Sequence, residues 1–226
     1  MRRTLVFLAA AFVVAMFLMT PVMAATSQGL SWGIKSGDRF SFRLTATGTE
    51  SDEPIDEGMY FDVEAAPPAL PNVMTSYNDI PSVSLGAYFD NGTSIGFLAF
   101  LFIGIGLVGG KLAVPVGNFT LLTKLLTNLI TENLTVKETY YFWTASSHGL
   151  LFYNAVQVET SYLKSDGFIA KYRMIVTNET HTLIDVSAVR LNLPSDVQDL
   201  IMSNLLYIAV GFVVLIIIGA VVCKKR

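Results

Sequence analysis

The sequence predicts an α+β domain: a mainly antiparallel β-sheet with one amphipathic helix, followed by a single C-terminal transmembrane helix. Three observations support this. Several segments alternate apolar and polar residues between Gly, Pro and Asn turns, which is typical of half-buried strands. One segment carries leucines at helical spacing. Both ends of the 226-residue chain are long apolar runs. The curvature of the sheet is left open.

The first residues have the three parts of a secretory signal. Arg2 and Arg3 precede an apolar run over residues 5–19, and small residues follow at Ala24 and Ala25. We therefore predict a signal peptide over residues 1–24. An uncleaved signal anchor is the alternative, because the apolar run is long for a signal. In either case the residues that follow leave the cytoplasm.

The other end of the chain predicts a membrane anchor. Residues 205–223 contain no charge, and at about 1.5 Å per residue a helix of this length spans about 28 Å, close to a hydrocarbon core. Lys224, Lys225 and Arg226 follow, as expected of a cytoplasmic flank. We predict a single-pass type I cell-membrane protein with an extracellular domain at 26–194, a juxtamembrane linker at 195–204 and a cytoplasmic tail at 224–226.

The predicted outer part is acidic and rich in glycosylation sequons. All 18 acidic residues lie between the apolar ends and five of the 15 basic residues do not, which leaves this part a net charge of −8. Such a balance excludes a nucleic-acid partner. N-x-S/T sequons begin at Asn91, Asn118, Asn133 and Asn178, which favours a surface glycoprotein. The only cysteine, Cys223, lies in the predicted anchor, so the domain holds no disulfide.

The strands follow one another along the domain. A Gly-Asp turn at 37 and 38 precedes a strand in which Phe40, Phe42 and Leu44 share one face. An acidic loop at 50–58 follows, which we read as a solvated loop rather than a calcium site because it lacks the EF-hand spacing. Further strands are predicted at 59–66, 83–92, 139–146, 150–164, 168–178 and 182–193. Asp166-Gly167 predicts a hairpin turn.

Residues 117–133 predict the amphipathic helix. Asn118 or Thr120 could cap its N-terminus. Its apolar stripe consists of Leu121, Leu122, Leu125, Leu126, Leu129 and Ile130. We expect this helix to lie on the sheet.

The apolar run at 94–111 has three interpretations. As a membrane span it is too short and too rich in glycine, and it would put the C-terminal basic residues outside. We expect a strand of the outer domain that is buried on both faces. The alternative is an exposed segment that contacts lipid or an apolar ligand through Phe97, Phe100, Phe102 and Ile105.

Catalytic motifs are missing from the sequence. Ser146-Ser147-His148-Gly149 places a nucleophile beside a base, but we expect it to form a turn without triad geometry. His148 and His181 are the only histidines. We therefore expect no enzymatic activity, no catalytic or metal-binding residues and no cofactor.

Four segments carry a resemblance to a known family: "GLSWGIKSGDRFSF", "LAVPVGNFTLLTKLL", "YLKSDGFIAKYRM" and the terminal anchor. Together they resemble a group of archaeal surface proteins of the choice-of-anchor type, which implies an envelope-anchored protein without implying an activity. A strongly curled sheet around one helix would also be similar to lipoprotein-carrier folds. Two functions follow as hypotheses: a non-enzymatic domain for recognition, adhesion or envelope structure, and a lipid or apolar-ligand-binding domain. The partner is a protein or a lipid, and the oligomeric state stays open.

Overall fold

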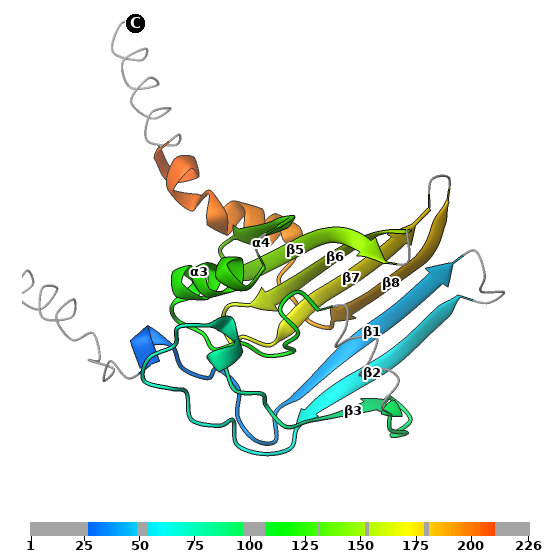
Figure 1. Cartoon of the computed structure of the whole chain (residues 1–226), viewed down its shortest axis with the longest axis horizontal. Coiled ribbons are helices and arrows are strands. Elements are labelled where there is room, and N and C mark those ends of the chain that lie inside the picture. Colours follow the sequence, from blue (N-terminus) through cyan, green and yellow to red (C-terminus); the bar gives the residue numbers. More distant parts are fainter. Residues whose placement is uncertain are drawn as a thin grey trace, which may run out of the picture.

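The computed structural model describes residues 27–48, 54–96, 107–130, 132–151, 154–178 and 181–210. Figure 1 shows one twisted sheet with short helices and loop segments against it. In chain order the elements are η1 (Ser27–Gly29), β1 (Arg39–Gly48), β2 (Ile55–Val63), η2 (Tyr77–Asp79), β3 (Leu85–Phe89), α3 (Phe119–Leu129), β4 (Leu134–Glu138), β5 (Phe142–Leu151), β6 (Asn154–Leu163), β7 (Ile169–Thr177), β8 (Thr182–Arg190) and α4 (Asp196–Ser203).

The eight strands form a single sheet in the order β3-β2-β1-β8-β7-β6-β5-β4, and every neighbouring pair is antiparallel. The prediction of a mainly antiparallel sheet is thus confirmed. Strands β1 to β3 form one meander and β4 to β8 form a second one. The pairing of β1 with β8 joins the two meanders, although these strands are far apart in sequence. Figure 1 shows this junction in the middle of the sheet.

Three details of the sheet differ from the prediction. The predicted loop at 50–58 contains the start of β2, which begins at Ile55. The predicted single strand at 150–164 contains the end of β5 and all of β6, since Leu151 pairs with Asn154 across a two-residue connection. Strand β4 was not predicted at all, although Leu134 and Val136 alternate with polar residues and are its half-buried positions.

One face of the sheet, which we call the inner face, carries the core. Phe168 is fully buried and lies at the centre of an aromatic cluster: its ring stacks on Phe40 at 4.1 Å and contacts Phe42 at 6.2 Å and Phe61 at 5.9 Å between ring centroids. Phe168 directly follows the predicted Asp166-Gly167 turn, which exists. Gly167 has φ +73°, and a side chain there would collide with the carbonyl oxygen of Val114.

Helix α3 covers part of the inner face. Its buried residues are Phe119, Leu122, Leu125 and Leu126, which confirms the centre of the predicted leucine stripe. Leu121 and Ile130 are half-buried, and Leu129 is exposed, contrary to the prediction. Asn118 caps the helix by accepting a hydrogen bond from the N–H of Leu121 at 3.0 Å. Beneath it, the fully buried Trp143 donates its indole N–H to the hydroxyl of Thr123 at 2.9 Å. This end of the sheet is therefore closely packed.

The other face, which we call the outer face, is polar. Three arginines make two-point cross-strand ion pairs: Arg39 with Asp62, Arg43 with Asp56 and Arg173 with Asp185. The three arginine side chains are more than half exposed, so solvent screens these pairs and they add little to stability. The sheet thus has one apolar and one solvated face, as its alternation predicts.

Most of the apolar run at 94–111 lies outside the described residues. At its described ends, Ile95, Gly96, Leu107 and Val108 are not in a strand, so the predicted strand does not include these four residues, and the rest of it stays a prediction. Leu107 and Val108 are buried and enter a turn, in which Gly109 has a positive φ. The turn ends any extended backbone at this point because glycine at positive φ breaks the pleat.

Helix α4 lies in the predicted juxtamembrane linker at 195–204 and follows β8. The predicted signal peptide and most of the predicted anchor lie outside the described residues. Within residues 27–210, apart from the gaps given above, no helix is long and apolar enough to cross a membrane.

Candidate functional site

An apolar pocket of about 310 Å³ lies on the inner face, beyond the part that α3 covers. Four strands contribute to it: β1 (Leu44, Ala46), β2 (Ile55, Met59), β7 (Tyr172, Met174) and β8 (Ile184, Val186, Ala188), with Ile95 after β3. Its volume is about twice the ~150 Å³ of a cavity that binds benzene. It lies within the usual range of small-molecule sites, about 300–1,000 Å³.

The pocket follows from the register of the sheet. Ala46 pairs with Ile55 on one side and with Val186 on the other. Val186 in turn pairs with Met174. Residues opposite one another in adjacent strands point to the same face, so one cross-strand row places four apolar side chains together. Ala46 is the smallest of the four. Its short side chain leaves part of the pocket volume between the longer side chains beside it.

Exposure changes along the pocket. Met59 and Tyr172 are 0% and 3% exposed, whereas Ile184 and Ile55 are 40% and 48% exposed. The pocket therefore has a closed end beside the aromatic core and an open end at the far tip of the sheet. An apolar chain could enter at the isoleucines and contact the methionine.

Tyr172 belongs to this lining through its ring, because the pocket presents no polar surface. The hydroxyl of Tyr172 is buried and has no hydrogen-bond partner in the described part of the chain. Burial raises the pKa of Tyr172 to about 12, so at neutral pH the hydroxyl is protonated and can donate a hydrogen bond. Buried polar groups in proteins nearly always have a partner, but this hydroxyl is closed off from the pocket and offers no contact to a ligand there.

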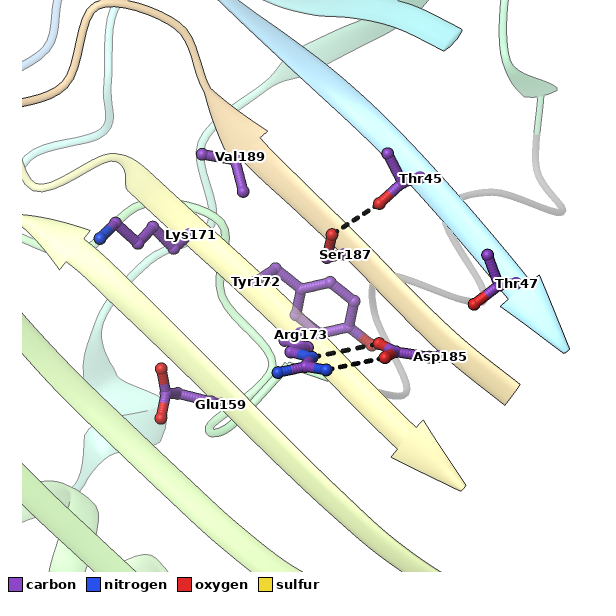
Figure 2. A pocket seen from close by; sticks show the side chains of 9 residues that line it. All are labelled: Thr45, Thr47, Glu159, Lys171, Tyr172, Arg173, Asp185, Ser187 and Val189. Carbon is purple, nitrogen blue, oxygen red and sulfur yellow. Dashed lines mark hydrogen bonds and ion pairs between the residues drawn. The ribbon is translucent and has the colours of Figure 1, made fainter. Parts of the chain in front are cut away.

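A second hollow, of about 330 Å³, lies on the outer face and is polar (Figure 2). Four of its charged and hydroxyl groups pair with one another: Arg173 with Asp185 at 2.7 Å, and Thr45 with Ser187 at 2.7 Å. Lys171 pairs with Asp196 of α4 at 2.6 Å. Since these groups already bond within the protein, the hollow offers less to a ligand than the inner pocket.

The four sequon asparagines lie at turns or at a helix end. Asn91, Asn133 and Asn178 are exposed. Asn118 is half-buried, and its side-chain nitrogen donates to the carbonyl of Gln28 at 2.9 Å. A glycan would be attached at that nitrogen. Asn118 is therefore the least suited of the four acceptors.

Several predicted site residues lie outside the described residues: Phe97, Phe100, Phe102 and Ile105 of the apolar run, and the flanking Lys224, Lys225 and Arg226. Their predicted contacts stay predictions. The pocket instead consists mainly of strand residues, with Ile95 from the start of the predicted apolar run.

The predicted Ser146–His148 turn is a strand. These residues lie within β5, where Ser146 pairs with Glu159 and His148 with Gln157. Alternation puts Ser146 and His148 on the outer face and Ser147 on the inner face. Among the described residues, no three His, Cys, Asp or Glu side chains form a group that could hold a metal ion.

Comparison of the chain with protein-family models, with curated proteins and with solved structures finds no match.

Proposed function

We propose that the domain binds an apolar or amphipathic ligand, such as the acyl chain of a lipid, in the inner pocket. The observation that carries this proposal is a lining made of apolar side chains from four strands, which is open at one end and is not filled by the residues that the structure describes. A pocket of this kind is the usual form of a small-molecule site. The protein acts by binding, without catalysis.

We further propose that this domain is exported and held at the cell membrane by the apolar run at 205–223. Its acidic charge and its four sequons favour an extracellular position, as does the signal-like start of the chain. A membrane anchor keeps the pocket near a source of acyl chains, which makes lipid the ligand class that fits best. The resemblance to archaeal envelope-anchored proteins agrees with this placement and adds no ligand.

The alternative is recognition or adhesion. The outer face supports it, because its arginine–aspartate pairs and the stacked rings of Tyr60 and Tyr88, 5.3 Å apart between centroids, form a broad solvated surface. Both functions could coexist, since the pocket and this surface lie on opposite faces of the sheet.

The pocket is tested with two neighbouring tryptophan substitutions. Ala46→Trp fills the pocket, whereas Thr47→Trp adds the same side chain on the outer face of the same strand. Full-length protein in lipid vesicles is labelled with a photoreactive fatty acid, and the labelled peptides are mapped by mass spectrometry. We expect Ala46→Trp to reduce labelling of β1 and β7 at least about tenfold, equivalent to ~1.4 kcal/mol of binding free energy.

Thr47→Trp is expected to label like the unmodified protein. Equal labelling of both variants, or an absence of label from β1 and β7 in the unmodified protein, would show that the pocket binds no acyl chain. Circular dichroism spectra that match between the two variants exclude misfolding as the cause of a difference.

The role of the Tyr172 hydroxyl is tested separately with Tyr172→Phe. The hydroxyl has no partner within the described protein, so its loss is expected to leave the free energy of unfolding unchanged or higher. The pocket presents no polar surface, so a long-chain alcohol and an alkane of the same length should each compete with the photolabel equally well in both proteins. Weaker competition by the alcohol in Tyr172→Phe alone would show that the hydroxyl contacts the ligand.

A further inference from the structure

Helix α4 is attached to the domain through its polar side. Asp199 accepts a hydrogen bond from the backbone N–H of Tyr141 at 2.9 Å, and the hydroxyl of Ser203 accepts one from the N–H of Tyr140 at 2.9 Å. Asp199 and Ser203 are four residues apart and so lie on one side of the helix. Both bonds fix α4 to the turn between β4 and β5, beside which it lies in Figure 1.

Two further contacts hold the first turn of α4. Asp196 makes an ion pair with Lys171 of β7 at 2.6 Å. Ser195 and Gln198 form a capping box, in which each side chain bonds the backbone N–H of the other residue. The helix therefore begins at a defined residue and is oriented against the sheet.

The apolar side of α4 points away from the domain. Val197, Leu200 and Ile201 have the i, i+3, i+4 spacing of one helix face, and they are 65%, 65% and 46% exposed. A helix packed on a soluble domain normally buries such a stripe and exposes its charges. Here the arrangement is reversed, and no residue of α4 is buried.

This stripe continues toward the C-terminus. The N–H of Ile208 donates to the carbonyl of Asn204, so a further helical segment begins directly after α4. Leu205, Leu206 and Tyr207 in that segment are 51%, 73% and 76% exposed. They open the uncharged run at 205–223, after which three basic residues come next. The exposed stripe is thus continuous with the segment proposed to enter the membrane.

We infer that α4 lies in the interface of the lipid bilayer, with Val197, Leu200 and Ile201 in contact with lipid and its polar side against the domain. This inference rests on the proposed membrane anchor. The exposed Tyr140 beside Ser203 is of the residue type that is enriched at the headgroup level. A second copy of the chain would cover only a limited patch of α4. A lipid bilayer can contact both the stripe on α4 and the exposed apolar residues at 205–207 that follow it.

Such an interfacial helix would fix the orientation of the domain. Because α4 is bonded to β7 and to the β4–β5 turn, contact of its apolar stripe with lipid holds the sheet at one angle to the membrane. A flexible linker would let the domain rotate freely above the bilayer.

The test uses the full chain with Cys223 replaced by serine, which removes the only cysteine. An environment-sensitive fluorophore is attached at Leu200→Cys, at Val197→Cys and, as a control, at Thr47→Cys on the exposed outer face of β1. Each protein is reconstituted into phosphatidylcholine vesicles with or without a nitroxide-labelled lipid. Flotation of the vesicles measures the anchor independently of the label.

We expect nitroxide lipid to quench positions 197 and 200 at least about threefold more than position 47. Floating protein with labels at 197 and 200 that stay accessible to aqueous iodide would overturn the interfacial helix and leave the anchor intact. Labels protected from iodide but not quenched by lipid would assign the stripe to a protein contact and equally overturn the inference. Protein that does not float would overturn the anchor and the interfacial helix together, whereas the pocket would be unaffected.

Discussion

Replacing Phe168 by alanine is expected to lower the free energy of unfolding by about 3–5 kcal/mol. The ring is fully buried and contacts Phe40, Phe42 and Phe61, so its removal leaves a cavity that these large rings can fill only partly. The cavity also lies where β1, β2 and the turn before β7 meet. The loss should therefore destabilise both meanders of the sheet at once.

Urea unfolding of the full chain, followed by tryptophan fluorescence, measures this effect, since Trp143 is fully buried. Phe168→Leu keeps most of the volume and is expected to cost less than about 1.5 kcal/mol, as conservative core substitutions do. Val189→Ala, 40% exposed on the outer face of β8, is the surface control and should change stability by less than about 0.5 kcal/mol. Similar midpoints for all three variants would contradict the central position of Phe168.

Much of the fold could be predicted from local patterns. Phe40, Phe42 and Leu44 alternate clearly enough to reveal β1, and Asn118 followed by the leucine stripe reveals α3. The start of β2 was missed because its residues are largely exposed, so burial leaves no alternation to detect. Strand β4 did carry a short alternating signal, in Leu134 and Val136, which the prediction overlooked. The turn between β5 and β6 escaped because no Gly or Pro marks it. Helix α4 did have a readable signal, the Ser195–Gln198 capping box.

The pocket could not be located from the sequence, because its lining comes from four strands whose pairing is not local. A size argument, however, could have predicted an uncovered apolar face. Helix α3 has 11 residues and is about 16 Å long, whereas eight strands about 4.8 Å apart extend over about 34 Å. One helix cannot cover such a sheet. Apolar residues on the inner face, such as Ala46, Met174 and Val186, therefore lie beyond the reach of this helix.

Replacing Asp166 by alanine is expected to lower the free energy of unfolding by about 2–4 kcal/mol. Its carboxylate accepts hydrogen bonds from Arg190 at 2.8 Å and from the backbone N–H of Phe168 at 2.9 Å. Both side chains of this ion pair are only 17% exposed, and the guanidinium group lies 4.4 Å from the ring centroid of Phe40. The alanine variant leaves a mostly buried cation without its counter-ion and an N–H group without its acceptor.

The matched control is Asp185→Ala, which removes the aspartate of an Arg–Asp pair whose arginine, Arg173, is 57% exposed. It should cost no more than about 1 kcal/mol, because solvent screens exposed pairs. Asp166→Asn retains an acceptor for the Phe168 N–H, so its cost isolates the charge contribution.

The double variant Asp166→Ala with Arg190→Met removes both charges and should recover part of the loss, since an apolar pair avoids the desolvation cost. Urea unfolding midpoints of these variants measure how much the buried ion pair stabilises the protein. Equal losses for Asp166→Ala and Asp185→Ala would mean that burial does not strengthen the pair that ties the β6–β7 turn to the end of β8. A larger loss for Asp166→Ala, partly recovered in the double variant, would show that the buried Arg190 must be paired with Asp166. This ion pair would then stabilise the β6–β7 turn and the aromatic cluster beside it.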